Sequence, residues 1–210
     1  AGVRLFVIGL FKKLFIADNL GFYVDGYYAS PLVFDSITAW FAVLSYTLQI
    51  YFDFSGYSDM AIGSSRIMGF RIEDNFNYPY LSTNIGEFWR RWHMTLSSWI
   101  RDYLYIPLGG SRKGPIRTYV NLMIAMLLCG LWHGAAWTFV FWGGYHGAAL
   151  CFHRAVKNKA MSDNKRFAES SGISVLKWFL TFFVVTLGWV FFRSPKFETA
   201  WQVLGQLFSP

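Results

Sequence analysis

Three apolar segments of this chain approach the roughly 20 residues that a helix needs to cross a bilayer. They run from Ile37 to Phe54, from Tyr119 to Phe152 and from Ile173 to Phe192, and the second is long enough for a hairpin of two helices. A fourth stretch, Leu5 to Ile16, contains two adjacent lysines, so it is either the end of a span or an interfacial segment. The segments predict an all-α, polytopic membrane protein.

The composition agrees with this prediction. Apolar residues make up 54% of the 210 residues and charged residues 15%, whereas soluble domains average about 25% charged residues. The 10 Trp, 12 Tyr and 22 Phe are more than a compact soluble core of this size can bury. This composition excludes disorder and a disulfide-stapled secreted module. Cys129 and Cys151 both lie in apolar stretches and are typical of small buried hydrophobic residues. The net charge of +7 then indicates anionic membrane lipid, not nucleic acid, as a partner.

Basic residues orient the predicted hairpin. They precede it at Arg101, Arg112, Lys113 and Arg117, and follow it at Arg154, Lys157, Lys159, Lys165, Arg166 and Lys177. Both flanks are therefore expected on the cytoplasmic side. The 14 residues from Tyr119 to Trp132 rise only about 21 Å, against a hydrocarbon core of about 30 Å. We expect the turn at Gly130–Trp137, with His133, to lie within the membrane's thickness, where protein or a water-filled cavity must satisfy its backbone.

The 65 residues from Asp53 to Arg117 mix aromatic and basic residues and are predicted to be interfacial or re-entrant. Asn84 and Glu87 have the spacing of a capping box, so a helix is expected to begin near Ile85. At 100° per residue, one face carries Phe88, Trp92, Leu96, Trp99 and Tyr103, and the opposite face carries Arg90, Ser97 and Arg101. This pattern predicts one continuous amphipathic helix at the membrane surface.

The four histidines differ in their surroundings. From its position, His133 is either a catalytic base in a membrane cavity or a structural turn residue. His93 lies on the border of the amphipathic helix, His146 is typical of a packed core histidine, and His153 is placed to contact headgroups.

Other residue clusters are compatible with other kinds of site. Asp53 and Asp59 at the end of a span could line an ion path, but a salt-bridged scaffold is favoured. Metal or haem binding has weak support, because Cys129 with His133, and His146 with His153, form no recognised ligand signature. The sequence contains neither a phosphate-binding glycine loop nor a Gly-x-Ser-x-Gly elbow.

Four motifs resemble the membrane-bound O-acyltransferase family, and within it the bacterial alginate O-acetyltransferase branch. They are Asn-Phe-Asn-Tyr-Pro-Tyr-Leu at 75–81, Glu-Phe-Trp-Arg-Arg-Trp-His-Met-Thr-Leu-Ser at 87–97, Arg-Asp-Tyr-Leu-Tyr-Ile-Pro-Leu-Gly-Gly at 101–110, and Gly-Leu-Trp-His-Gly at 130–134. The stretch from Tyr51 to Asp59 fits the same branch, and the resemblance runs from about Phe11 to Phe192. D-alanyl transferases of teichoic-acid modification share the motifs at His93 and His133 but are less similar across Pro107–Lys113.

The resemblance implies an enzyme with a catalytic tunnel across the membrane. It implies His133 as catalytic base, His93 as a second catalytic histidine, and Arg90, Arg91 and Trp132 as substrate-binding residues. It further implies acetyl-CoA as acyl donor with no bound cofactor and no metal, periplasmic acetyltransferase partner proteins, and an exported polysaccharide such as alginate as final acceptor. The protein is then expected in the bacterial inner membrane as a multi-pass protein.

The domain organisation and two alternatives complete the expectations. Residues 1–210 are expected to form a single, partial acyltransferase domain whose N- and C-terminal spans lie outside this sequence. One alternative is a non-catalytic channel or transporter-like subunit of a polysaccharide modification complex, motivated by Asp53, Asp59 and Arg66. The other is D-alanyl transfer to a cell-envelope polymer.

Overall fold

The computed structural model describes residues 1–162 and 171–209, and this part of the chain is all helical. It divides into two compact units, residues 1–76 with 193–210 and residues 77–192. Within the described part, α6 (Gly114–His133) and α8 (Ser171–Arg193) are the two helices long and apolar enough to cross a membrane. They match the first arm of the predicted hairpin and the predicted span from Ile173 to Phe192.

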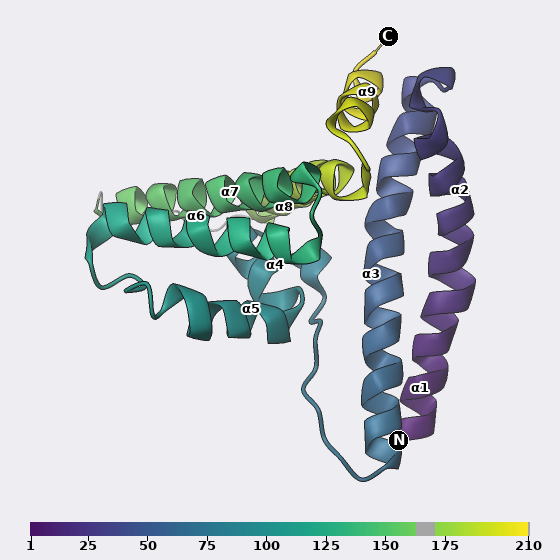
Figure 1. Cartoon of the computed structure of the whole chain (residues 1–210), viewed down its shortest axis with the longest axis horizontal. Coiled ribbons are helices and arrows are strands. Elements are labelled where there is room, and N and C mark those ends of the chain that lie inside the picture. Colours follow the sequence, from purple (N-terminus) through teal and green to yellow (C-terminus); the bar gives the residue numbers. More distant parts are fainter. Residues whose placement is uncertain (163–170, 210) are drawn as a thin grey trace. The chain divides into compact units, whose positions relative to one another are not determined.

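The first unit is built on two long antiparallel helical rods (Figure 1). One consists of α1 (Gly2–Phe11), a π-helical stretch (Lys12–Ala17) and α2 (Asp18–Ala29), and the other is α3 (Ser36–Ile67). Asp35 caps α3, because its Oδ1 accepts a hydrogen bond from the Thr38 N–H at 2.8 Å.

The interfacial placement of the residues from Asp53 onward stays a prediction, but helix α3 continues unbroken past Asp53 to Ile67. The reason for its length is close packing against α1. A Cβ on Gly56 would lie 2.7 Å from the Gly9 carbonyl oxygen, and one on Gly63 would lie 2.8 Å from that of Gly2. Small residues of this kind let two helix backbones touch, and the gain in contact keeps the polar end of α3 helical.

Ion pairs join the two rods at the same level. Lys12 Nζ lies 2.6 Å from Asp59 Oδ2, and Lys13 Nζ lies 2.6 Å from Asp53 Oδ1 and 2.8 Å from Asp18 Oδ1. The two lysines that interrupt the first apolar stretch therefore serve as partners for the carboxylates of α3. This geometry supports the salt-bridged scaffold over the ion path.

The segment after residue 193 forms α9 (Phe197–Leu207), which packs on α3 within the first unit. Ala200, Val203 and Leu207 form its buried face, and Trp40 Nε1 of α3 donates a hydrogen bond to the Leu207 carbonyl at 3.0 Å.

The second unit contains a 3₁₀ turn (Pro79–Leu81), α4 (Ile85–Arg91), α5 (Met94–Ile100), a π-helical stretch (Arg101–Tyr105), α6, α7 (Trp137–Ser162) and α8. Helices α6 and α7 form the predicted hairpin and lie side by side (Figure 1). A Cβ on Gly130 would lie 2.2 Å from the Phe139 carbonyl oxygen, so backbones touch here too. The turn occupies residues 134–136, which is shorter than the predicted Gly130–Trp137 turn.

Helix α6 begins at Gly114, five residues before the expected start at Tyr119. Its 20 residues span about 30 Å, which equals the thickness of the hydrocarbon core. The length argument that placed His133 within the membrane's thickness therefore no longer holds, and the depth of His133 stays a prediction.

The expected continuous helix from Ile85 is broken at His93, which has φ of +44°. The cap itself is confirmed, since Asn84 Oδ1 accepts from the Glu87 N–H at 2.8 Å. The break separates the predicted aromatic face into two parts. Phe88 and Trp92 are buried, whereas Trp99 and Tyr103 are exposed.

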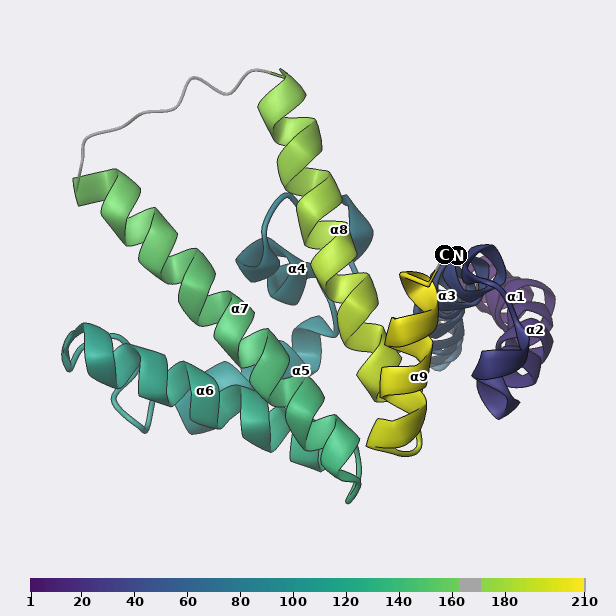
Figure 2. The same cartoon turned by 90° about the horizontal axis from the view of Figure 1, so that it is seen from above.

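The first half of α7 packs against the second half of α8. Figure 2 shows the two helices diverging from this contact, with α4 between them. Aromatic rings fill the contact. Phe88 of α4 lies 6.5 Å from Trp189 of α8 and 6.3 Å from His146 of α7, ring centre to ring centre. This aromatic core holds the elements that carry the histidines.

Candidate active site

His133 ends α6 and is surrounded by aromatic rings. Its imidazole centre lies 5.0 Å from Phe192, 5.3 Å from Trp142 and 6.4 Å from Phe139. Gly134 follows with extended backbone, and a Cβ there would lie 2.7 Å from the Phe139 ring. The glycine therefore lets the chain turn without pushing Phe139 away, and the half-buried imidazole stands in a fixed aromatic frame.

His93 is brought to the same place by the helix break. The Trp132 indole lies 4.9 Å from the His133 ring and 6.2 Å from the His93 ring, so it joins the two imidazoles. A left-handed backbone is uncommon for a residue other than glycine, and such strain often accompanies a functional site. Burial lowers the pKa of His93 to about 4, so its imidazole is neutral at physiological pH.

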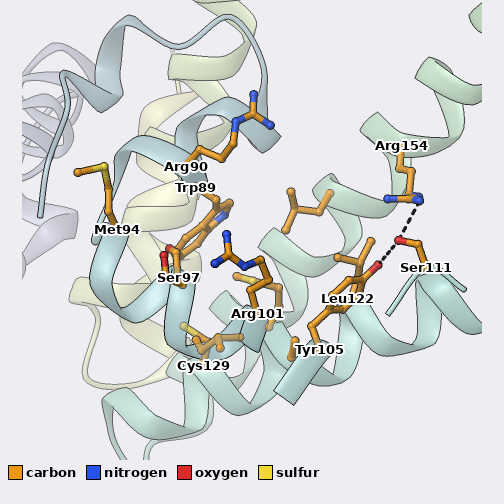
Figure 3. A pocket seen from close by; sticks show the side chains of 15 residues that line it. Trp89, Arg90, Met94, Ser97, Arg101, Tyr105, Ser111, Leu122, Cys129 and Arg154 are labelled. Atoms are coloured by element: carbon orange, nitrogen blue, oxygen red, sulfur yellow. Dashed lines mark hydrogen bonds between the residues drawn. The ribbon is translucent and has the colours of Figure 1, made fainter. Parts of the chain in front are cut away.

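A cavity of about 620 Å³ lies beside the two histidines, between α4, α5, α6 and α7 (Figure 3). Met94 and Cys129 belong to its wall, directly after His93 and one helical turn before His133. The far wall carries Ser111 and Arg154. The cavity therefore extends from the basic flank of the hairpin to residues adjacent to the two histidines, which are not themselves part of its wall.

Three arginines line the cavity, namely Arg90, Arg101 and Arg154. Arg154 Nη2 donates to Ser111 Oγ at 3.1 Å, and Ser111 Oγ lies 2.8 Å from the Tyr105 hydroxyl (Figure 3). Because this contact joins the residues before α6 to α7, the two basic flanks lie at one end of the hairpin, as predicted. Lys165 and Arg166 lie outside the described residues.

Arg101 and Arg154 are functional candidates that sequence reasoning missed. The sequence presents both only as topology signals, and Arg101 also as part of the arginine face of an amphipathic helix at the membrane surface. The signal that could have found them is their cationic character on both sides of one apolar hairpin, since the hairpin brings its two ends together.

Arg90 and Arg91 separate in the structure. Arg90 lines the cavity, whereas Arg91 Nη2 pairs with Glu87 Oε1 at 2.7 Å and is not part of the cavity wall. Burial raises the pKa of Glu87, but hydrogen bonds from Thr83 and the charges of Arg91 and Arg90 lower it more, so the net shift is downward. Trp132 is 63% exposed, which leaves one side of its indole open to a ligand.

Of the remaining histidines, His146 is a packed core histidine as predicted, whereas the headgroup contact of His153 stays a prediction. His146 is fully buried in the aromatic core of the second unit, and His153 is half-buried near Gly86 of α4. Among residues 1–162 and 171–209, no three His, Cys, Asp or Glu side chains gather closely enough to hold a metal ion.

Comparisons with known proteins connect this geometry to an activity class. Residues 1–192 match the family model described as the membrane-bound O-acyltransferase family. A protein of Azotobacter vinelandii named "Probable alginate O-acetylase AlgI" is 48% identical over 99% of this chain and 40% of its own length.

Two further relatives have names that refer to other polymers. A peptidoglycan O-acetyltransferase of Helicobacter pylori is 45% identical over 97% of this chain and 38% of its own length. A teichoic acid D-alanyltransferase of Bacillus subtilis is 34% identical over 73% of this chain and 40% of its own length. The chain thus spans about 40% of the length of the curated relatives that it matches.

Proposed function

Because the chain belongs to the membrane-bound O-acyltransferase family, we propose that the full-length protein is an acetyltransferase of the cell envelope. It takes an acetyl group from a cytoplasmic thioester donor, acetyl-CoA, and passes it across the membrane for O-acetylation of an exported polysaccharide such as alginate. The observation that carries the proposal is the position of His133, which lies one helical turn beyond an arginine-lined cavity and beside a second imidazole.

His133 is the general base of this reaction. An imidazole nitrogen takes the proton from the acceptor hydroxyl while its oxygen attacks the thioester carbonyl carbon. The carbon–sulfur bond then breaks, the imidazolium returns the proton to the thiolate, and the free thiol leaves. General base catalysis of this kind contributes about 10²- to 10⁴-fold, and the aromatic frame around His133 supplies orientation.

His93 and Trp132 orient the donor. With a pKa of about 4, His93 adds no positive charge near pH 7, so it acts as a neutral hydrogen-bonding group beside the thioester. The exposed indole of Trp132 gives the acyl group an apolar surface between the two imidazoles.

The arginines bind the donor's phosphates. Arg90, Arg101 and Arg154 line one cavity, and guanidinium groups match phosphate oxygens in geometry as well as charge. Arg91, which the resemblance also assigns to substrate binding, is held by Glu87 and keeps α4 in place. Its contribution to donor binding is therefore smaller than that of Arg90.

The proposal also assigns each end of the hairpin to one side of the membrane, from the positions of its basic residues. The basic end of the α6–α7 hairpin faces the cytoplasm, where the donor is made, in a multi-pass protein of the bacterial inner membrane. Transfer to an exported polymer then requires an acceptor on the other side, and periplasmic acetyltransferase partners carry the group onward.

The test compares wild-type full-length protein with His133→Ala in purified form, with radiolabelled acetyl-CoA as donor. We expect release of free CoA from the wild type and a loss of at least 100-fold in the variant at equal unfolding temperature. Equal rates would refute His133 as the base. Absence of turnover in the wild type, with acetylation of the polymer intact in cells, would favour the channel subunit, and turnover only with a D-alanyl thioester would favour the envelope D-alanyltransferase.

A further inference from the structure

A buried imidazole lies behind the candidate site and has no part in the mechanism above. His146 is 0% exposed, and within the described residues neither of its ring nitrogens has a hydrogen-bond partner. The indole N–H groups of Trp89 and Trp142 also lack partners there. Their rings lie 5.3 and 5.0 Å from the His146 ring, so three unpaired polar side chains meet in an otherwise apolar core.

This arrangement costs stability that an apolar residue of the same shape would not. A buried polar group without a partner keeps its desolvation penalty, whereas an apolar replacement of equal volume removes it. The ring is also tightly confined, because Phe88 is stacked with it at 6.3 Å and a Cβ on Gly188 would lie 2.8 Å from its Nε2. The unpaired nitrogens of the imidazole therefore lower stability, and the confinement leaves little room for a ring larger than imidazole.

Trp142 connects this imidazole with His133. Its indole is 1% exposed and lies 5.0 Å from His146 and 5.3 Å from His133, with the His133 ring nearly perpendicular to it at 88°. An indole this confined cannot turn without moving both imidazoles. The orientation of His133 thus depends on what fixes Trp142.

We propose that His146 is a positioning residue for acyl transfer, and that it acts on His133 through the Trp142 indole. The chemistry of the cluster allows one kind of pairing, because indole nitrogens only donate while an imidazole nitrogen can accept. Hydrogen bonds of this kind often tighten only when substrate is bound. In the occupied site, the Trp142 N–H donates a hydrogen bond to an imidazole nitrogen of His146. This bond fixes the plane of the Trp142 indole and thereby the orientation of the His133 ring that packs against it. The inference rests on the proposed function.

The decisive variant is His146→Phe in the full-length protein, because it keeps an aromatic ring, although a larger one, and removes the nitrogens. We expect an unfolding temperature close to that of the wild type, because removing the unpaired nitrogens offsets the overpacking by the larger phenyl ring. We expect a kcat at least tenfold lower and a KM for acetyl-CoA within twofold. His146→Gln, which supplies a carbonyl acceptor, restores part of the kcat. His153→Phe is the matched control on the same helix and keeps the wild-type kcat.

The path through Trp142 is tested by a double variant. If His146 acts through this indole, adding His146→Phe to Trp142→Phe lowers kcat no further. Multiplying losses would overturn the path. A wild-type kcat in His146→Phe would overturn the proposal. A joint loss of unfolding temperature and activity that His146→Gln does not restore would also overturn it, because such a loss marks a residue needed only for the fold.

A readout without turnover separates this inference from the proposed function. The rate at which diethyl pyrocarbonate modifies His133, followed by mass spectrometry, reports how the imidazole is presented. We expect His146→Phe to change that rate several-fold and His153→Phe to leave it unchanged. A wild type that transfers no acetyl group refutes the proposed function, while an unchanged His133 modification rate refutes the positioning role.

Discussion

Gly143 gives the sharpest test of how the α6–α7 hairpin builds the site. A Cβ at this position would lie 2.2 Å from the Met126 carbonyl oxygen, whereas ordinary contacts of a Cβ begin at 3.4 Å. A backbone carbonyl inside a helix cannot turn away, so Gly143→Ala forces the two helices apart by roughly 1 Å. We expect this overpacking to cost about 1–3 kcal/mol of stability.

The same displacement reaches the chemistry. Trp142 is the neighbour of Gly143 on α7 and packs against His133 on α6, so separating the helices shifts the base relative to its frame. A misplacement of about 1 Å can reduce a rate by about 10²-fold. Gly143→Ala should therefore lose both unfolding temperature and acetyl transfer.

Gly144→Ala is the control on the same helix. Its added Cβ would meet only the flexible end of Leu127, Cδ2, at 3.4 Å. Relief of the glycine's conformational freedom should then make this variant equal to the wild type or about 0.5–1 kcal/mol more stable. Both variants are measured as full-length protein in detergent, by thermal unfolding and by CoA release. Equal behaviour of the two alanines would show that backbone contact does not set the helix spacing.

Three further predictions concern charged residues. The pKa of Glu87 in the folded protein lies below its usual 4.5. The ionised carboxylate therefore stabilises the fold above pH 4.5, and this stabilisation is lost as the pH falls through the folded pKa. Glu87→Gln should therefore show a smaller drop in unfolding temperature than the wild type between pH 6 and pH 4. Arg90→Ala should raise the KM for acetyl-CoA about tenfold, as loss of one charge-assisted hydrogen bond implies. Steady-state kinetics should show a smaller increase in KM for Arg91→Ala. A larger increase for Arg91→Ala than for Arg90→Ala would refute the cavity as the donor site. Lys12→Met should destabilise the fold by about 2 kcal/mol because it leaves Asp59 unpaired. Thermal unfolding should show that the double variant Lys12→Met with Asp59→Leu is more stable than Lys12→Met alone. Equal losses in the two variants would mean that the ion pair contributes little.

Much of the candidate site could be predicted from local sequence. The cap at Asn84, the turn after His133 and the α6–α7 hairpin each depend on neighbouring residues, and each was found in the structure. The grouping of Arg90, Arg101 and Arg154 was not predicted, because it depends on the ends of α6 and α7 meeting across more than 40 residues.

The helix break at His93 shows where local patterns fail. A wheel drawn at 100° per residue assumes unbroken helical geometry, and nothing in the residues from Ile85 to Tyr103 marks a left-handed position. The burial of Phe88 and Trp92 among the rings of α7 and α8 accompanies the break, which places His93 against Trp132. Tertiary packing overrode a local preference at the point where the two histidines meet.

By itself, the sequence indicated a membrane environment, the helical periodicity and the candidate residues for acyl-transfer chemistry, because apolar length, charge placement and short motifs act locally. Only the tertiary structure decided which of these residues meet. Contacts between side chains far apart in sequence placed Arg90 with Arg101 and Arg154 in one cavity wall, paired the carboxylates of α3 with Lys12 and Lys13, and set Trp142 between two imidazoles. The physical reason is that packing in a dense core depends on shapes that meet in three dimensions, and no local pattern contains them.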